Sequence, residues 1–243
     1  MIDPADFIIS RKRKKYKFAL FANSSLCAEY DEWDREFCPD IIEVGAGTGL
    51  FAVGLAERYP DKRVLAVDVK ADRLQKGAGL AAEKGLTNVR FLRARVDQLG
   101  DLLSPHSVEA VWVTFPDPFP RKRSAKNRLT HPRFLALYQK LLQPQGSVCF
   151  KTDAPELFAW SLEQLVAERW RIAQLSFDLH DSTLPDDYKM QTTYERRFMA
   201  EGLPIQFVRA STFSNQYLRT TNRPSGRLFG SDIMGCSQFN TEM

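Results

Sequence analysis

The segment 114–128, TFPDPFPRKRSAKNR, places an aspartate, aromatic rings and positive charges within a few residues of one another. Asp117 stands between two prolines, and Phe115 and Phe119 lie on either side. Prolines at this density end a strand or a helix, so the sequence predicts a stiff loop after an apolar strand. A carboxylate beside aromatic rings can accept hydrogen bonds from a flat heterocycle that stacks on them. The alternative is a surface turn that Asp117 caps.

Two short segments hold a large share of the positive charge. Residues 11–17 contain six Lys and Arg, residues 121–128 contain five, and the rest of the chain has 23 Lys and Arg against 30 Asp and Glu. Positive charge confined to two patches is typical of a surface that binds a polyanion. For residues 11–17 the alternative is a solvated tail. The residues expected to contact the phosphates of such a polyanion are Arg11, Lys12, Arg13, Lys14, Lys15, Lys122, Arg123, Lys126 and Arg128.

A glycine-rich loop, Gly45-Ala46-Gly47-Thr48-Gly49, follows an apolar run and precedes an amphipathic stretch. Glycines allow a tight turn and let the backbone approach a ligand closely. Leu50 stands where a dinucleotide-binding fold has its last glycine, which argues against NAD. The spacing therefore favours a different nucleotide-like ligand.

Two acidic residues narrow down that ligand. Glu43 ends the strand before the glycine loop, where a carboxylate disfavours pyrophosphate and favours an amino-bearing or cationic group. Asp68 ends the next predicted strand, where a carboxylate can accept both ribose hydroxyls. Together they indicate S-adenosylmethionine, and the alternative is a Rossmann-like domain that binds another nucleotide.

The elements around these residues alternate between strands and helices. The predicted strands are 41–44, 64–67, 89–92, 108–114, 147–151 and 205–209, and the predicted helices are 50–59, 71–84, 96–103, 132–142 and 155–169. This alternation predicts an α/β fold with a doubly wound, mostly parallel sheet. We expect a basic N-terminal arm (1–37), one domain (38–210) and a flexible C-terminal tail (211–243).

Composition excludes several other classes of protein. A hydrophobic content of 44% supports a sizeable core, and no apolar run approaches the roughly 18 residues of a membrane span. The N-terminus lacks the apolar region of a signal peptide. The four cysteines form no CxxC pair and the three histidines have no ligand spacing, so we expect no metal, reduced thiols and a cytoplasmic protein.

Six motifs resemble those of the bacterial tRNA (guanine-N7)-methyltransferases in order and spacing. They are EVGAGTG, AVDV, NVRFL, FPDPFPRKR, KTD and TTYE, and the match covers roughly residues 38 to 209. The resemblance implies a class I methyltransferase fold with a seven-stranded sheet, S-adenosylmethionine as cofactor, and methyl transfer to N7 of the guanine at variable-loop position 46 of tRNA. Thr114 and Phe119 depart from the usual Asn and Trp, and Arg121 replaces a usual Lys.

The resemblance also implies roles for individual residues. Asp117 would be the catalytic residue, positioning the reactants, since guanine N7 already carries a lone pair and needs no general base. Arg95 stands where an Asp commonly touches the adenine, and Asp97 is the nearest carboxylate. Implied cofactor contacts are Glu43, Gly45, Gly47, Gly49, Asp68, Arg95 and Asp117, and implied substrate contacts are Arg121, Asp153, Thr192, Thr193, Tyr194 and Glu195.

Local structure offers alternatives for several of these residues. Thr192 and Glu195 form a Thr-x-x-Glu pattern, which is also a helix capping box. Asp153 precedes Pro155 and could cap a helix. Methyl transfer to another base or to a protein amino group, and an RNA-binding module without catalysis, are the competing functions.

Overall fold

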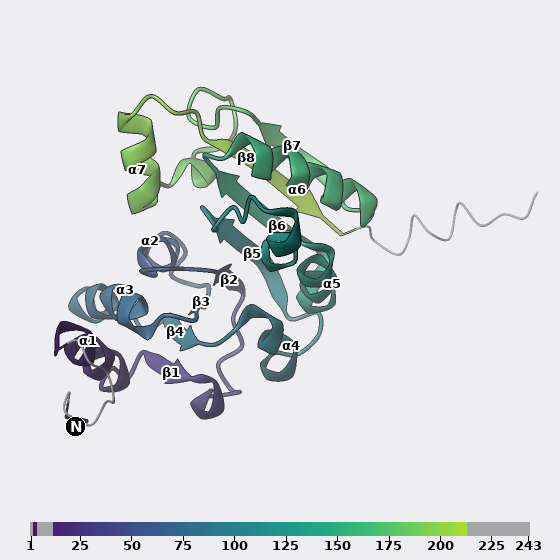
Figure 1. The fold of residues 1–243 in the computed structure, drawn as a ribbon. Coiled ribbons are helices and arrows are strands. Elements are labelled where there is room, and N and C mark those ends of the chain that lie inside the picture. The colour runs from purple at the N-terminus through teal and green to yellow at the C-terminus, as the bar shows by residue number, and fades with distance from the viewer. Residues whose placement is uncertain (1, 4–11, 213–243) are drawn as a thin grey trace, which may run out of the picture. The chain divides into compact units, whose positions relative to one another are not determined.

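Eight strands form one sheet in the order β1-β4-β3-β2-β5-β6-β8-β7 (Figure 1). The computed structural model describes residues 2–3 and 12–212, all within one unit that spans Met1–Phe213. The strands are β1 (Cys27–Glu29), β2 (Ile41–Val44), β3 (Val64–Asp68), β4 (Val89–Arg93), β5 (Val108–Thr114), β6 (Leu142–Thr152), β7 (Arg171–Ser176) and β8 (Gln206–Ser211). The first six in spatial order pair in parallel, and β8 runs antiparallel to both β6 and β7.

Helices connect the strands in the described part of the chain. The α-helices are α1 (Lys12–Ala22), α2 (Leu50–Arg58), α3 (Ala71–Glu83), α4 (Leu99–Leu102), α5 (Pro132–Leu141), α6 (Pro155–Ala167) and α7 (Thr193–Ala200). Short 3₁₀ turns are η2 (Tyr30–Glu32), η3 (Val96–Gln98), η4 (Lys122–Asn127) and η5 (Asp186–Lys189). Among the residues that the structure describes, no helix is long and apolar enough to cross a membrane.

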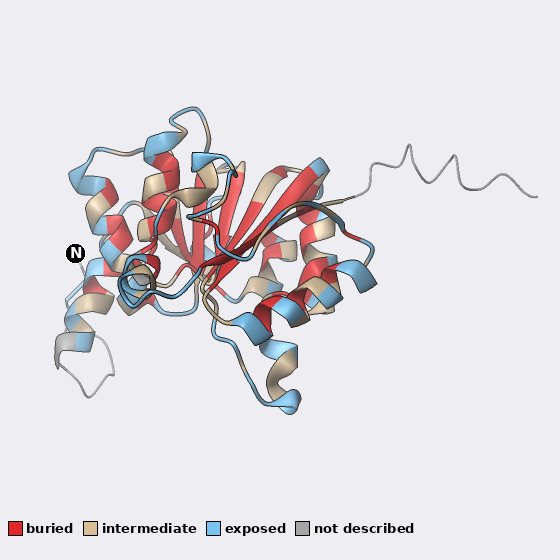
Figure 2. Cartoon of the chain, turned by 90° about the horizontal axis from the view of Figure 1, so that it is seen from above, coloured by how far each residue is buried: buried red, intermediate tan, exposed pale blue. Residues whose placement is uncertain are grey.

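Alternating side chains along the strands build two hydrophobic layers. In β2, Ile41 packs into the layer that α1, α2 and α3 cover, whereas Ile42 and Val44 pack into the layer under α4, α5 and α6. Figure 2 shows the buried residues concentrated in the strands and on the helix faces that contact them. All four residues of β2 are buried, as expected of a parallel strand covered on both faces.

The predicted fold class is confirmed, with one more strand than the seven expected. The predicted strands that begin at Ile41, Val64, Val89 and Val108 begin at those residues in the structure. Two strands were not among the six located in the sequence: β7 (Arg171–Ser176) and β1, which adds Cys27–Glu29 in parallel to β4 at one edge of the sheet. A strand of three residues shows too few alternations to be found from the sequence.

Residues 12–37, which the sequence predicts as an arm, carry elements that contact the sheet. Helix α1 lies against α3, and Phe21 is only 2% exposed in the layer on that face. Trp33 is buried in the opposite layer. Phe21 is therefore a core residue.

Gly77 explains how α3 comes close to the glycine loop. A Cβ atom at this position would lie 2.7 Å from the Thr48 carbonyl oxygen and 2.9 Å from the Gly49 carbonyl carbon. The Gly77 amide donates to that Thr48 oxygen at 2.9 Å. Glycine disfavours a helix interior, but at this position its small size lets α3 support the loop.

We predict that Phe21→Ala lowers the free energy of unfolding by about 3–5 kcal/mol, because it leaves a cavity in a packed layer. Chemical denaturation measures the change. The control is Tyr16→Ala on the same helix, where the side chain is 59% exposed and the change should stay within about 0.5 kcal/mol. Equal, small effects at both positions would mean that α1 is not part of the cooperative core.

Candidate functional site

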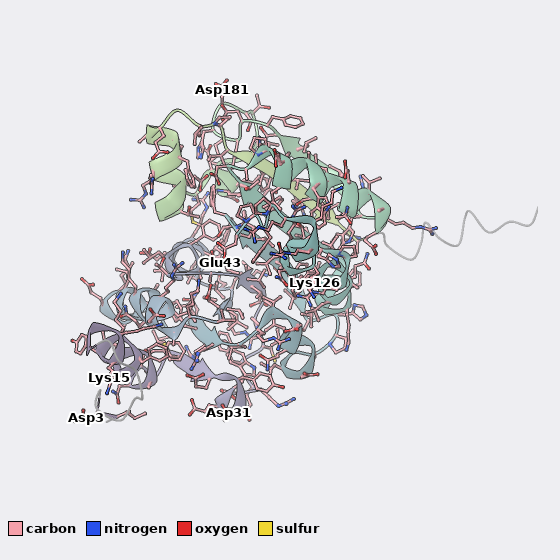
Figure 3. All side chains as sticks on the ribbon, viewed as in Figure 1. Asp3, Lys15, Asp31, Glu43, Lys126 and Asp181 are labelled. Carbon is pink, nitrogen blue, oxygen red and sulfur yellow. The ribbon has the colours of Figure 1, made fainter. Side chains whose placement is uncertain are left out.

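A cavity of about 880 Å³ lies at the carboxyl ends of the central strands. Glu43, Asp68 and Asp153 line it from the ends of β2, β3 and β6, and Asp117 lines it from the loop after β5. Figure 3 marks Glu43 at the centre of the molecule and Lys126, which also lines the cavity, on the side near α5. Ligands of open α/β sheets bind at this edge, where the helix connections diverge.

The glycine loop adopts backbone conformations that favour glycine. Gly45, Gly47 and Gly49 have φ angles of +69°, +55° and +69°. A Cβ atom at Gly45 would lie 2.8 Å from Leu129, and one at Gly49 would lie 2.6 Å from Phe91. The positive φ angles favour glycine at all three positions, and close neighbours add a steric reason at Gly45 and Gly49. Gly45 and Gly47 line the cavity, and Gly49 precedes α2.

Asp68 is hydrogen-bonded to this loop. Its Oδ2 atom accepts a hydrogen bond from the Gly47 amide at 2.8 Å, and its Oδ1 atom accepts one from the Lys70 amide at 2.9 Å. Each carboxylate oxygen has a second lone pair for another donor. Asp68 can therefore hold the loop in place and still accept hydroxyl groups of a ligand.

Glu43 is a buried carboxylate with polar neighbours and no cation. It is 1% exposed, accepts from Thr114 Oγ1 at 2.7 Å and from the Ala52 amide at 3.1 Å, and forms no ion pair with any described residue. Burial raises its pKa to about 8, and the nearby Asp68 charge adds to the shift. An uncompensated carboxylate at the wall of a cavity favours a ligand that brings a positive charge.

Arg95 and Asp97 lie together on the same cavity wall. Arg95 Nε donates to Asp97 Oδ1 at 3.0 Å, and Arg95 Nη2 also donates to Asp97 Oδ2. The guanidinium lowers the pKa of the Asp97 carboxyl. Asp97, the nearest carboxylate to position 95, therefore lines the cavity in an exposed ion pair with Arg95.

The loop after β5 is held in a strained conformation. Phe115 and Phe119 have φ angles of +46° and +43°, which for bulky residues cost on the order of 1–3 kcal/mol each. Arg128 stabilises the loop, because Nε donates to the Pro118 carbonyl at 3.0 Å and Nη2 to the Phe119 carbonyl at 3.1 Å. Asp117 lies between the two strained residues with its side chain exposed at the cavity.

Arg128 differs from the other cations of this segment. Its guanidinium also lies 4.4 Å from the centre of the Trp160 ring. Arg121, Lys122, Arg123 and Lys126 are exposed and form no ion pair with any described residue. The structure thus separates a strip of four free cations from one arginine that is used within the protein, although the sequence groups Arg128 with the phosphate contacts.

The predicted substrate contacts divide into two groups. Asp153 and Thr192 line the cavity, and partial burial raises the pKa of Asp153. The residue that caps α6 is Ala154, so Asp153 is not used as a cap. Glu195 is fully buried and does not line the cavity, because its oxygens already bind groups of the protein.

Several residues that were predicted to contact the substrate or RNA phosphates lie away from the cavity or are not described by the structure. Arg11 is outside the described residues, and the side chains of Lys12, Arg13, Thr193 and Tyr194 are not described. Lys14 and Lys15 belong to α1 and do not line the cavity. Arg121, Lys122 and Arg123 do not line it either, but they shortly precede Lys126, which does.

Thr114 and Phe198 are two of the lining residues that were not expected from the sequence. Thr114 binds Glu43, and its position at the end of a strand beside β2 was a usable signal. Phe198 of α7 also lines the cavity and packs on Phe115 with ring centres 5.7 Å apart. No local pattern predicts Phe198, since its place depends on how α7 docks. Within the described ranges, no group of His, Cys, Asp and Glu could hold a metal ion.

Comparisons with known proteins identify relatives in sequence. A family model described as "Putative methyltransferase" matches residues 38–208. A tRNA (guanine-N(7)-)-methyltransferase of Cytophaga hutchinsonii is 38% identical over 184 residues, covering 74% of this chain and 83% of the relative. The enzyme of that name from Brevibacillus brevis is 38% identical over 173 residues, covering 71% of this chain and 80% of the relative.

Solved structures share the fold at low identity. The 16S rRNA methyltransferase KamB superposes with a TM-score of 0.55 and 18% identity, covering 74% of this chain and 90% of KamB. A mutant of the 16S rRNA (adenine(1408)-N(1))-methyltransferase from Catenulisporales acidiphilia, solved with its cosubstrate SAM, has a TM-score of 0.52 and 14% identity, covering 88% of this chain and 92% of that chain. These likenesses establish the fold.

We predict that Glu43→Gln makes the stability of the ligand-free protein less dependent on pH. The folded protein binds the Glu43 proton more tightly than the unfolded chain does, so wild-type stability falls as the pH rises from 4.5 to about 8. The difference should reach a few kcal/mol, because one pKa unit corresponds to about 1.4 kcal/mol. Urea denaturation across this pH range measures it, and parallel curves for both proteins would contradict the assignment.

Proposed function

This chain belongs to the tRNA (guanine-N7)-methyltransferase family, and from that premise we propose that it transfers the methyl group of S-adenosylmethionine to N7 of the guanine at variable-loop position 46 of tRNA. The observation that carries the proposal is a single cavity lined by Glu43 and Asp68 on one side and by Asp117 and Asp153 on the other. The first pair suits the cofactor and the second pair suits a base. Since its substrate is tRNA, we place the enzyme in the cytoplasm.

The residues at the ends of β2 and β3 fit the cofactor. The buried carboxylate of Glu43 lacks a positive partner among the described residues, and the cofactor's amino acid portion carries an ammonium group. The backbone of Gly47 leaves open space where a side chain would stand, because no atom lies within 4 Å of a Cβ built there. Asp68 has lone pairs free for the ribose hydroxyls, and we assign Arg95 and Asp97, which line the same cavity, to the adenine.

Bound S-adenosylmethionine supplies an electrophilic methyl group on a sulfonium. The lone pair of guanine N7 forms the new N–C bond as the S–C bond breaks, so no proton has to leave the base. The protein's contribution is alignment and exclusion of water. Asp117 and Asp153 can accept the N1–H and N2–H donors of guanine, and Phe115 and Phe119 offer aromatic faces beside Asp117. We assign Asp117 as the catalytic positioning residue on this basis.

The RNA backbone would meet the free cations next to the cavity. Arg121, Lys122, Arg123 and Lys126 are exposed in and beside η4, which follows the Asp117 loop directly. Phosphate contacts of this kind set the register of a nucleic acid without reading its sequence. In this assignment Arg128 orders the loop rather than binding phosphate.

Mapping the methylated nucleoside on bulk tRNA after incubation with labelled S-adenosylmethionine tests the proposed function. The expected product is 7-methylguanosine at position 46. Label on another base or on protein, or cofactor binding without transfer, would favour the competing functions.

We predict that Asp117→Asn lowers the single-turnover methylation rate by roughly a hundredfold, because loss of about an ångström of alignment has that effect. Overall fold and bulk tRNA affinity should change little, since phosphate contacts dominate affinity. Rapid-quench kinetics and filter binding provide the two measurements. A near wild-type rate would reduce this loop to a structural turn.

We predict that a triple variant, in which Gln replaces each of Lys122, Arg123 and Lys126, has a flatter salt dependence of tRNA binding. The slope of log affinity against log salt should fall by about 1 for each lost phosphate contact. The matched control is Arg128→Gln, which also removes a charge from this segment but should leave the slope almost unchanged and slow methylation instead. Equal slope changes per charge removed would mean that Arg128 also contacts phosphate.

A further inference from the structure

The most deeply buried charges of the described chain lie just behind the cavity, on Lys151 of β6 and Glu195 of α7. We propose that this ion pair is a positioning device for the base-binding wall, and that Glu195 acts through Thr192 and α7 rather than by touching the RNA. This inference rests on the proposed function and specifies how one wall of that site is held.

Both charged groups form hydrogen bonds and an ion pair inside the protein. Lys151 and Glu195 side chains are each 0% exposed, and Lys151 Nζ lies 3.1 Å and 3.3 Å from the two oxygens of Glu195. The ammonium also donates to the Met190 carbonyl at 2.9 Å. Glu195 Oε1 lies 2.8 Å from His180 Nε2, and Oε2 accepts from the Thr192 amide at 3.0 Å. A substrate could reach this carboxylate only by breaking contacts that keep a buried charge paired.

Lys151 joins the pair to the loop that carries Asp117. Its backbone carbonyl accepts a hydrogen bond from the Phe115 amide at 2.9 Å. Two residues later along the chain, Asp153 lines the cavity. A shift of Lys151 would therefore move the start of the Asp117 loop and the second carboxylate together.

Glu195 joins the pair to the opposite part of the wall. It forms a capping box in which Thr192 Oγ1 accepts from the Glu195 amide at 2.9 Å while the Glu195 side chain binds the Thr192 amide. Thr192 lines the cavity, and so does Phe198, one of the last residues of the same helix, which packs on Phe115. The pair thus ties three parts of one wall to a common point: the loop at Phe115, the end of β6, and α7.

The surroundings make this pair sensitive to the loss of one partner. Lys151 Nζ lies 5.6 Å from the centre of the Phe51 ring and 6.0 Å from that of Trp112, and both charged side chains are shielded from solvent. Removing one buried partner leaves an unpaired charge, whereas replacing both with uncharged side chains is often tolerated. This asymmetry separates a positioning role from a direct contact.

The test compares Lys151→Met, Glu195→Gln and the double variant in single-turnover methylation of tRNA. Gln at position 195 can still cap Thr192 and bind His180, and Met at position 151 suits the aromatic surroundings. Each single variant should lose about 10- to 100-fold in rate. The double variant should recover to at least about threefold above Glu195→Gln, because no charge is left unpaired. S-adenosylmethionine affinity should stay within about twofold in all three, since Glu43 and Asp68 are untouched.

The control is Glu57→Gln, which breaks an exposed pair with Lys84 away from the cavity lining and should leave the rate unchanged. A double variant no faster than Glu195→Gln would overturn the proposal, because a missing substrate contact cannot be restored by changing Lys151. Wild-type rates in all variants would overturn it as well.

Two further measurements keep the test decisive. If a single variant does not fold, His180→Gln replaces it, and a rate loss at unchanged cofactor affinity supports the positioning role, whereas an unchanged rate overturns it.

If the wild type transfers no methyl group to tRNA, the proposed function fails, and hydrogen exchange of the α7 amides still reports on the pair. Exchange that is faster in the single variants than in the double variant would support the positioning of α7, and equal exchange in all three would overturn it.

Discussion

The parallel register of β2 with β3 and β5 is the constraint on which the site depends. Glu43 lies opposite Ala66 in β3 and Trp112 in β5, so the three strands end at nearly the same level. Their last residues, and those that follow them, must therefore meet at one edge. Because neighbouring strands in a sheet are only about 5 Å apart, acids separated by many residues in sequence line one cavity. Slipping one strand by a single residue would turn its side chains to the other face of the sheet.

Two buried glutamates show how environment assigns different roles to one residue type. Glu43 receives hydrogen bonds from neutral donors only, so its charge is unfavourable without a ligand and its pKa rises to about 8. Glu195 already has Lys151 as a cation and gains nothing from another. Burial alone does not mark a ligand-binding acid. The absence of a cation among its described neighbours is what leaves Glu43 suited to a positively charged ligand.

Most of the fold and several of the residues that line the cavity could be predicted from the sequence, and the division has a physical basis. Strands such as Val108–Thr114 and helices such as Pro132–Leu141 carry dense local signals, so their first residues were found. Glu43, Asp68 and Asp117 follow directly from strand ends. The role of Glu195 could not be found, because a Thr-x-x-Glu pattern says that a helix begins and not which buried lysine its carboxylate meets. The same limit applies to Phe198, whose contact with Phe115 is set by tertiary docking.

Arg128 shows why charge counts along a sequence overstate a nucleic-acid surface. It lies in a strip of five cations, yet its donors satisfy the carbonyls of Pro118 and Phe119 and its flat face covers Trp160. A loop with two bulky residues at positive φ needs such support, because unsupported strain of this kind relaxes to another conformation. A lysine could not provide two directed donors and a stacking plane at once. The arginine is therefore better explained by the geometry of the Asp117 loop than by the charge of the RNA, and the four exposed cations beside it remain the proposed phosphate contacts.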